Sequence, residues 1–96
     1  MLVLPEELTQ TQANACLGML VQGMRSVPGA AVVVDASALS RFDSSALAVL
    51  LEFRRACLAQ GKALSIQALP ERLASLAKLY GITELLASTE APAIAA

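Results

Sequence analysis

Apolar residues in the first quarter of the chain recur at three- and four-residue steps, the spacing of one face of an α-helix. The pattern predicts an amphipathic helix over residues 9–24, followed by the chain-breaking pair Pro28-Gly29. Before it, residues 2–4 are a short strand candidate that ends at Pro5. The repeating apolar positions are Ala13, Cys16, Leu17, Leu20, Val21 and Met24.

The middle of the chain switches between strand-like and helix-like patterns. Residues 30–34 are a continuous apolar run rich in valine, which is typical of a strand covered on both faces. A second helix is predicted over residues 44–60, because Gly61 then falls just past the helix end, where glycine is favoured. Residues 64–68 are a further short strand.

The last third predicts one more helix. Pro70 fits the first turn of a helix that runs to about residue 79 and is closed by Tyr80-Gly81. Residues 82–86 fit a short helix or strand, and residues 88–96 resemble a frayed tail. Alternating strands and helices favour one α/β domain, residues 1–87, with a central and mostly parallel sheet.

Composition narrows the class of protein. Of the 96 residues 56% are hydrophobic and 16% charged, which argues against disorder, and a net charge of -1 gives no footprint for nucleic acid. No apolar stretch approaches the length of a membrane span, and the first residues do not resemble a signal peptide. Cys16 and Cys57 fall among apolar neighbours and are expected to be buried thiols, which fits a cytoplasmic protein.

The residue inventory argues against an enzyme. The chain has no histidine, no phosphate-binding glycine motif and no dense carboxylate cluster, so we expect no catalytic triad, metal or cofactor. Asp35 at a strand end resembles the phosphoacceptor of a receiver domain. That fold needs further acids and a suitably placed lysine, and the only lysines here are Lys62 and Lys78.

Polar residues gather where the second helix begins. Asp43 is predicted to be the N-cap, because a carboxylate there accepts hydrogen bonds from free first-turn amides. Phe42 and Leu47 then take the positions of a hydrophobic staple. Ser44 and Ser45 become the first two helical residues, at a helix end that favours a phosphate. The simpler interpretation is that all three polar residues only start the helix.

Two more polar residues lie on the same predicted edge of the sheet. Asp35 ends its strand, and Ser37 follows in the loop that leads to the helix. Open α/β sheets usually bind ligands at this edge. The alternative for Asp35 is a structural one, in which its side chain caps its own turn.

The second helix carries two apolar surfaces. One face is predicted to be core and comprises Ala46, Val49, Leu50, Phe53 and Cys57. A separate ridge lies about 100° further round. A neighbouring helix of the same domain covers this ridge, or it is an exposed patch for a protein partner. The ridge consists of Leu47, Leu51 and Leu58, bordered by Arg54 and Arg55.

The segment VVVDASALSRFDSSALAVLLEF resembles the signature of STAS domains, the family that includes anti-sigma factor antagonists. In that family a strand ends in Asp-x-Ser, and Asp-Ser-Ser-Gly-Leu or Asp-Thr-x-Gly-Leu later begins a helix. Here Asp35-Ala36-Ser37 and Asp43-Ser44-Ser45-Ala46-Leu47 match those elements. The segment LASLAKLYGITELL, residues 73–86, is similar to the MlaB-like branch, the STAS subunits of a bacterial phospholipid ABC transporter.

The resemblance implies a role for each matched residue. Ser44 takes the position that is phosphorylated or contacts a partner, with Asp43 and Ser45 supporting it. The MlaB-like branch implies a non-catalytic subunit that binds the cytoplasmic ATPase, reaches the inner membrane only through that partner and supports transporter assembly. The alternative within the family is an antagonist that binds an anti-sigma serine kinase and is regulated by phosphorylation of Ser44.

Two features depart from the family. Ala46 stands where the family usually has glycine, and alanine favours the helix but narrows the approach of a partner backbone. STAS domains usually begin with a two-strand hairpin, and the sequence pattern here predicts only one strand before the first helix. This predicts either a start placed too far downstream or an exposed sheet edge, which would allow a homodimer through that edge.

Overall fold

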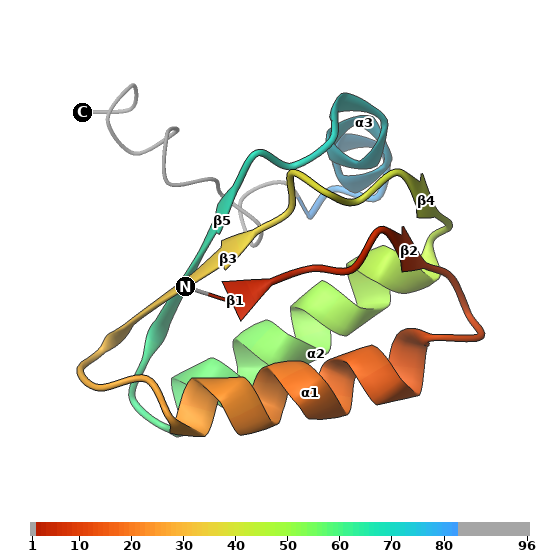
Figure 1. Cartoon of the computed structure of the whole chain (residues 1–96). Helices are drawn as coiled ribbons and strands as arrows, with labels where there is room; N and C mark the ends of the chain where they lie inside the picture. Colours follow the sequence, from red (N-terminus) through yellow and green to blue (C-terminus); the bar gives the residue numbers. More distant parts are fainter. Residues whose placement is uncertain (1, 83–96) are drawn as a thin grey trace.

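The computed structural model describes residues 2–82. It confirms a small α/β fold with three helices and parallel strands (Figure 1). Predictions for residues 83–96, including the tail and most of the element proposed for residues 82–86, lie outside the described residues. The elements are β1 (Leu2–Val3), β2 (Glu7–Leu8), α1 (Ala13–Arg25), β3 (Ala31–Asp35), β4 (Arg41–Phe42), α2 (Ser45–Ala59), β5 (Ala63–Gln67) and α3 (Glu71–Leu79).

The strands form two sheets. In the larger one β3 lies between β1 and β5, and in the smaller one β2 pairs with β4. Every pairing between described strands is parallel, with Leu2 and Ile66 on either side of Val34. The sequence analysis did not predict β2 and β4, because a two-residue strand has no periodicity to detect. Two strands rather than one therefore precede α1. That the chain lacks the first strand of the hairpin usual in STAS domains stays a prediction.

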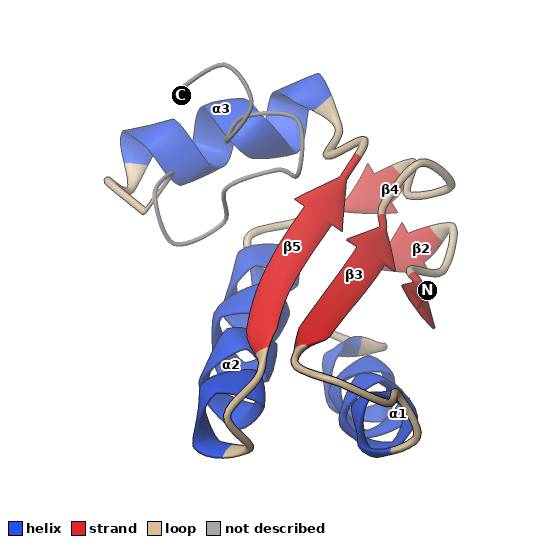
Figure 2. Ribbon diagram, turned by 90° about the vertical axis from the view of Figure 1, so that its left-hand side faces the viewer, coloured by secondary structure: helices blue, strands red, loops and turns tan. Residues whose placement is uncertain are grey.

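Helices α1 and α2 lie side by side on one face of the larger sheet (Figure 2). Val32 and Val34 point to that face and are fully buried, whereas Val33 is half-buried and Ala31 is exposed. The described elements therefore cover this strand fully on one face and partly on the other. A run of valines does not reveal this, because apolar residues are allowed on the exposed face of a sheet.

The first helix begins four residues later than its apolar spacing predicted. Residues 9–12 form a turn instead, in which the Thr9 amide and hydroxyl both donate to Gln12 Oε1, at 2.9 and 2.6 Å. The Gln12 amide in turn donates to the Thr9 carbonyl at 3.0 Å. Threonine and glutamine side chains that bond locally offer the backbone an alternative to the helix.

The ends of the other two helices follow the prediction. Gly61 has a φ of 71° and donates to the Leu58 carbonyl at 3.0 Å, while Lys62 donates to Cys57 at 2.8 Å. This pair of bonds is the Schellman motif, which requires a left-handed residue just past the helix end. Gly81 closes α3 in the same way, with a φ of 73°.

The core consists mainly of aliphatic side chains around one aromatic ring. Phe53 of α2 is 0% exposed, as are Val32 and Leu50. Cys16 and Cys57 are buried free thiols as predicted, and burial raises the pKa of both. Among residues 2–82, no helix is both long enough and apolar enough to cross a membrane.

Replacing Phe53 by alanine is expected to lower the free energy of unfolding by about 3–5 kcal/mol, because a large cavity would open beneath the sheet. Leu58→Ala on the same helix is the matched control. Its side chain is 51% exposed, so a change of no more than about 0.5 kcal/mol is expected. Urea titrations followed by circular dichroism compare the two, and equal losses would contradict the assignment of the core.

Candidate functional site

The predicted site begins where β3 ends. The carbonyl of Asp35 accepts the Leu4 amide and the Ala36 amide donates to the Gln67 carbonyl, both at 2.9 Å, so the strand end is held on both sides. The Asp35 carboxylate accepts the Ser37 amide at 2.9 Å. This bond to the Ser37 backbone lowers the pKa of Asp35. The geometry agrees with the structural alternative, in which Asp35 caps its own turn.

The loop from β3 to α2 is fastened to the segment before α1. Ala36 and Leu39 are buried in the core and anchor the start of the loop. Further along, the amides of Ser40 and Arg41 both donate to the Glu6 carbonyl, at 2.8 and 3.0 Å. The pairing of β2 with β4 continues this contact. The loop therefore has a defined path from the sheet to the helix.

Asp43 joins the start of α2 to the chain that precedes α1. Its Oδ1 accepts the Ser45 amide at 2.8 Å, and its Oδ2 accepts the Gln10 amide at 3.2 Å. Hydrogen bonding, first of all to the Ser45 backbone, lowers the pKa of Asp43. The predicted hydrogen bond to the first turn is therefore present.

The helix begins at Ser45, one residue later than predicted. The Ser44 backbone is nevertheless already helical, with φ and ψ of -63° and -16°. The Ala46 amide donates to the Asp43 carbonyl at 3.0 Å, so the first turn is tighter than an α-turn. Asp43 therefore caps the first turn through its carboxylate, as predicted.

The two serines at this tip have different surroundings. Ser44 is exposed, and within residues 2–82 its hydroxyl makes no hydrogen bond. Ser45 is half-buried and is held through its backbone by Asp43. Ser37 is exposed at the strand end, and in the described part of the chain no hydrogen bond joins the Asp35–Ser37 turn to the Asp43–Ser45 tip. Of the two serines at the tip, Ser44 is thus the one whose hydroxyl is exposed and unbonded among the described residues.

The predicted ridge on α2 is divided by the fold. Helix α1 packs on the side of α2 that carries Ala48, Val49 and Glu52, and these three residues line a small hollow shared with α1. Leu47 is only 2% exposed and belongs to the core, so its place in an exposed ridge was wrong. The remaining ridge members range from half-buried to exposed. Leu51 and Arg54 are half-buried, Leu58 is exposed, and the exposed Arg55 forms an ion pair with Glu52 at 3.0 Å.

A comparison with protein-family models agrees with this geometry. The model described as "Mlab, STAS domain" matches residues 1–87. The chain belongs to the MlaB-like STAS family. A search of curated proteins returned no match. STAS domains are generally non-catalytic binding domains, and the family thus supports a protein-interaction role for this chain.

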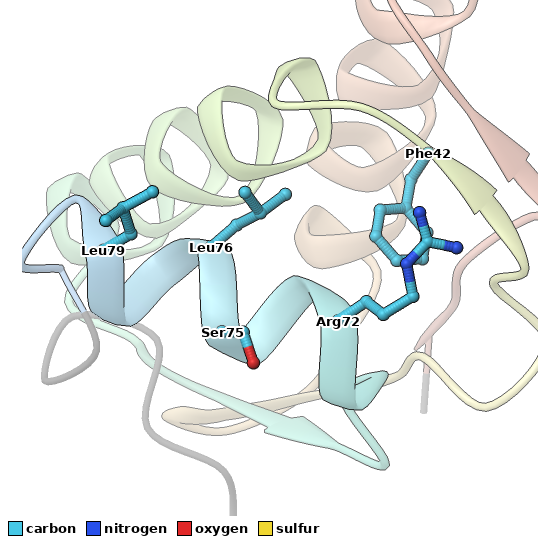
Figure 3. Close-up of a pocket in the computed structure, with 5 residues that line it drawn as sticks. All are labelled: Phe42, Arg72, Ser75, Leu76 and Leu79. Carbon is cyan, nitrogen blue, oxygen red and sulfur yellow. The ribbon is translucent and has the colours of Figure 1, made fainter.

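A second surface of this STAS domain was not predicted from its sequence. A hollow of about 410 Å³ lies between α3 and Phe42, and the Arg72 guanidinium lies 5.7 Å from the centre of the Phe42 ring (Figure 3). The spacing of Arg72, Ser75, Leu76 and Leu79 places them on one face of α3. Only the fold brings Phe42 to that face. The residues that line the hollow are Phe42, Arg72, Ser75, Leu76 and Leu79.

Asp43→Asn is expected to lower stability at neutral pH and to flatten its acid dependence. The pKa of Asp43 in the folded chain lies below its ordinary value of 3.8, so ionisation favours folding above that pH. This contribution is lost as the pH falls through 3.8 toward the lowered value. Asparagine keeps an oxygen that can accept an amide but has no charge to lose.

Urea midpoints measured from about pH 7 to about pH 3 test this expectation. The wild-type midpoint should exceed that of Asp43→Asn at neutral pH, and the two should converge in acid. Ser44→Ala is the matched control, since the described residues leave that hydroxyl unbonded, and its profile should follow the wild type. A constant difference at every pH would show that the Asp43 charge does not stabilise the tip.

Proposed function

We propose that this STAS domain is a non-catalytic accessory subunit that binds the cytoplasmic ATPase of a phospholipid ABC transporter. In this proposal it supports assembly and activity of the transporter, and it lies in the cytoplasm, at the inner membrane only through that partner. The MlaB-like family match supports a role in protein interaction. The similarity of residues 73–86 to the MlaB-like branch favours the transporter as the partner.

The observation that carries the proposal is the free Ser44 hydroxyl on a fixed helix tip. Asp43, next to the contact point, accepts hydrogen bonds from two backbone amides, so the tip does not have to be ordered when a partner arrives. The hydroxyl can both donate and accept a hydrogen bond. Binding to a complementary polar group would then cost little conformational entropy.

The same geometry makes the tip sensitive to charge. A phosphate on Ser44 would place about −1.5 to −2 charges next to the Asp43 carboxylate. Like charges on neighbouring residues repel, and this repulsion would act on the carboxylate that accepts the Gln10 amide. Phosphorylation of Ser44 is therefore expected to weaken docking rather than to create it.

Binding of the purified ATPase by variants at Ser44 tests the proposal. Ser44→Ala removes one polar contact, and an increase in Kd of several-fold is expected. Ser44→Glu adds charge and bulk, and a loss of about tenfold or more, equivalent to about 1.4 kcal/mol, is expected. Isothermal titration calorimetry with the ATPase measures both.

Ser26→Glu is the matched control. Ser26 is an exposed serine between the end of α1 and the start of β3, at the amino end of the strands. The Ser26→Glu variant should bind the ATPase with the same Kd as the wild type. Unchanged binding by both Ser44 variants would rule out docking through this tip. Recovery of an anti-sigma serine kinase from cells, with no ATPase, would favour the antagonist role instead.

A further inference from the structure

The hollow beside α3 is open and apolar along most of its length. The Leu79 side chain is 77% exposed, and Leu76 and Phe42 are half-buried (Figure 3). Its volume of about 410 Å³ is large enough to accept side chains of another chain. Leucine at this exposure is a cost to a soluble surface unless something covers it.

One end of the hollow is cationic. Arg72 is exposed and lies over the Phe42 ring, where its charge is attracted to the ring face but is not neutralised. Within residues 2–82 the single ion pair joins Arg55 to Glu52, so no described carboxylate binds Arg72. Ser75 lines the same hollow. The guanidinium suits a carboxylate, which Arg binds in a bidentate manner.

The hollow is connected to the docking tip through Phe42. This residue ends β4 only two positions before Ser44, and its ring forms one wall of the hollow. A partner that meets Ser44 therefore has a second apolar and cationic surface near its point of contact.

We infer that the hollow binds an acidic–apolar segment of the protein that docks on Ser44. An apolar side chain of this segment packs on Phe42, Leu76 and Leu79, and a neighbouring carboxylate pairs with Arg72. Charge complementarity carries the choice of occupant, because the described residues that line the hollow supply a cation and no acid. The inference rests on the proposed function in taking the owner of the segment to be the transporter ATPase.

Photo-crosslinking in cells tests the occupant directly. A photo-reactive amino acid replaces Leu79 in the full chain, and the cross-linked segment is identified by mass spectrometry. The matched control carries the same group at Lys78, which is exposed on α3 but does not line the hollow. Position 79 should capture a segment with an aspartate or glutamate within one helical turn of an apolar residue, and position 78 should not.

Charge reversal then tests the carboxylate. Arg72→Glu should reduce the cross-link at position 79 about tenfold, as expected for the loss of one charge-assisted contact. Changing the captured acid to arginine should restore the cross-link in the Arg72→Glu chain. Lys78→Glu should leave the yield unchanged, and urea midpoints verify that each variant is folded.

The remaining outcomes overturn the inference. They are no product at position 79, a product with a second copy or with residues 83–96 of the same chain, or a segment that lacks an acid. Captured ATPase that is insensitive to Arg72→Glu would refute the acidic segment and leave the proposed function standing. An acidic segment from a protein other than the ATPase, rescued by charge reversal, would support the binding chemistry and refute the transporter assignment.

Discussion

Burial of Val32 and Val34 beneath α1 and α2 fixes β3 as the central strand, and the candidate site is positioned from the end of that strand. Because β3 pairs with both β1 and β5, the backbone at Asp35 and Ala36 is bonded on both sides where the strand ends. The loop to α2 therefore leaves the sheet from a fixed point. The loop leads to α2, and α2 is held against the same core by the fully buried Phe53.

Neighbouring residues at the helix tip differ in how far they are engaged in holding the fold. Asp43 is occupied with two backbone amides, which joins the start of α2 to the chain before α1. Ser44, the next residue, is exposed and has no such task within the described chain. Under the proposed function, Ser44 could therefore be bound without first breaking a bond that holds the tip. A charge added there still acts on the tip, because it lies beside the Asp43 carboxylate.

Local sequence predicted the central strand, most of α2 and the ends of α2 and α3. Valine runs and apolar spacing are properties of consecutive residues, and the glycines at 61 and 81 mark positive φ angles that few other residues adopt. The start of α1 was predicted less well, since the Thr9–Gln12 turn competes with a helix that the apolar pattern also allows. The short strands β2 and β4 depend on each other across the fold and have no local signal.

For the site, the sequence by itself determined that Asp35, Asp43 and the serines lie at the carboxyl edge of the sheet, because strand and helix order dictates it. Tertiary structure decided which of these groups remain free. The packing of α1 on one side of α2 leaves Leu58 exposed on the other, while Leu47 is buried in the core. The hollow at Phe42 and Arg72 likewise joins residues 30 positions apart. Exposure depends on which elements pack together, and that information is not present in any single stretch of the chain.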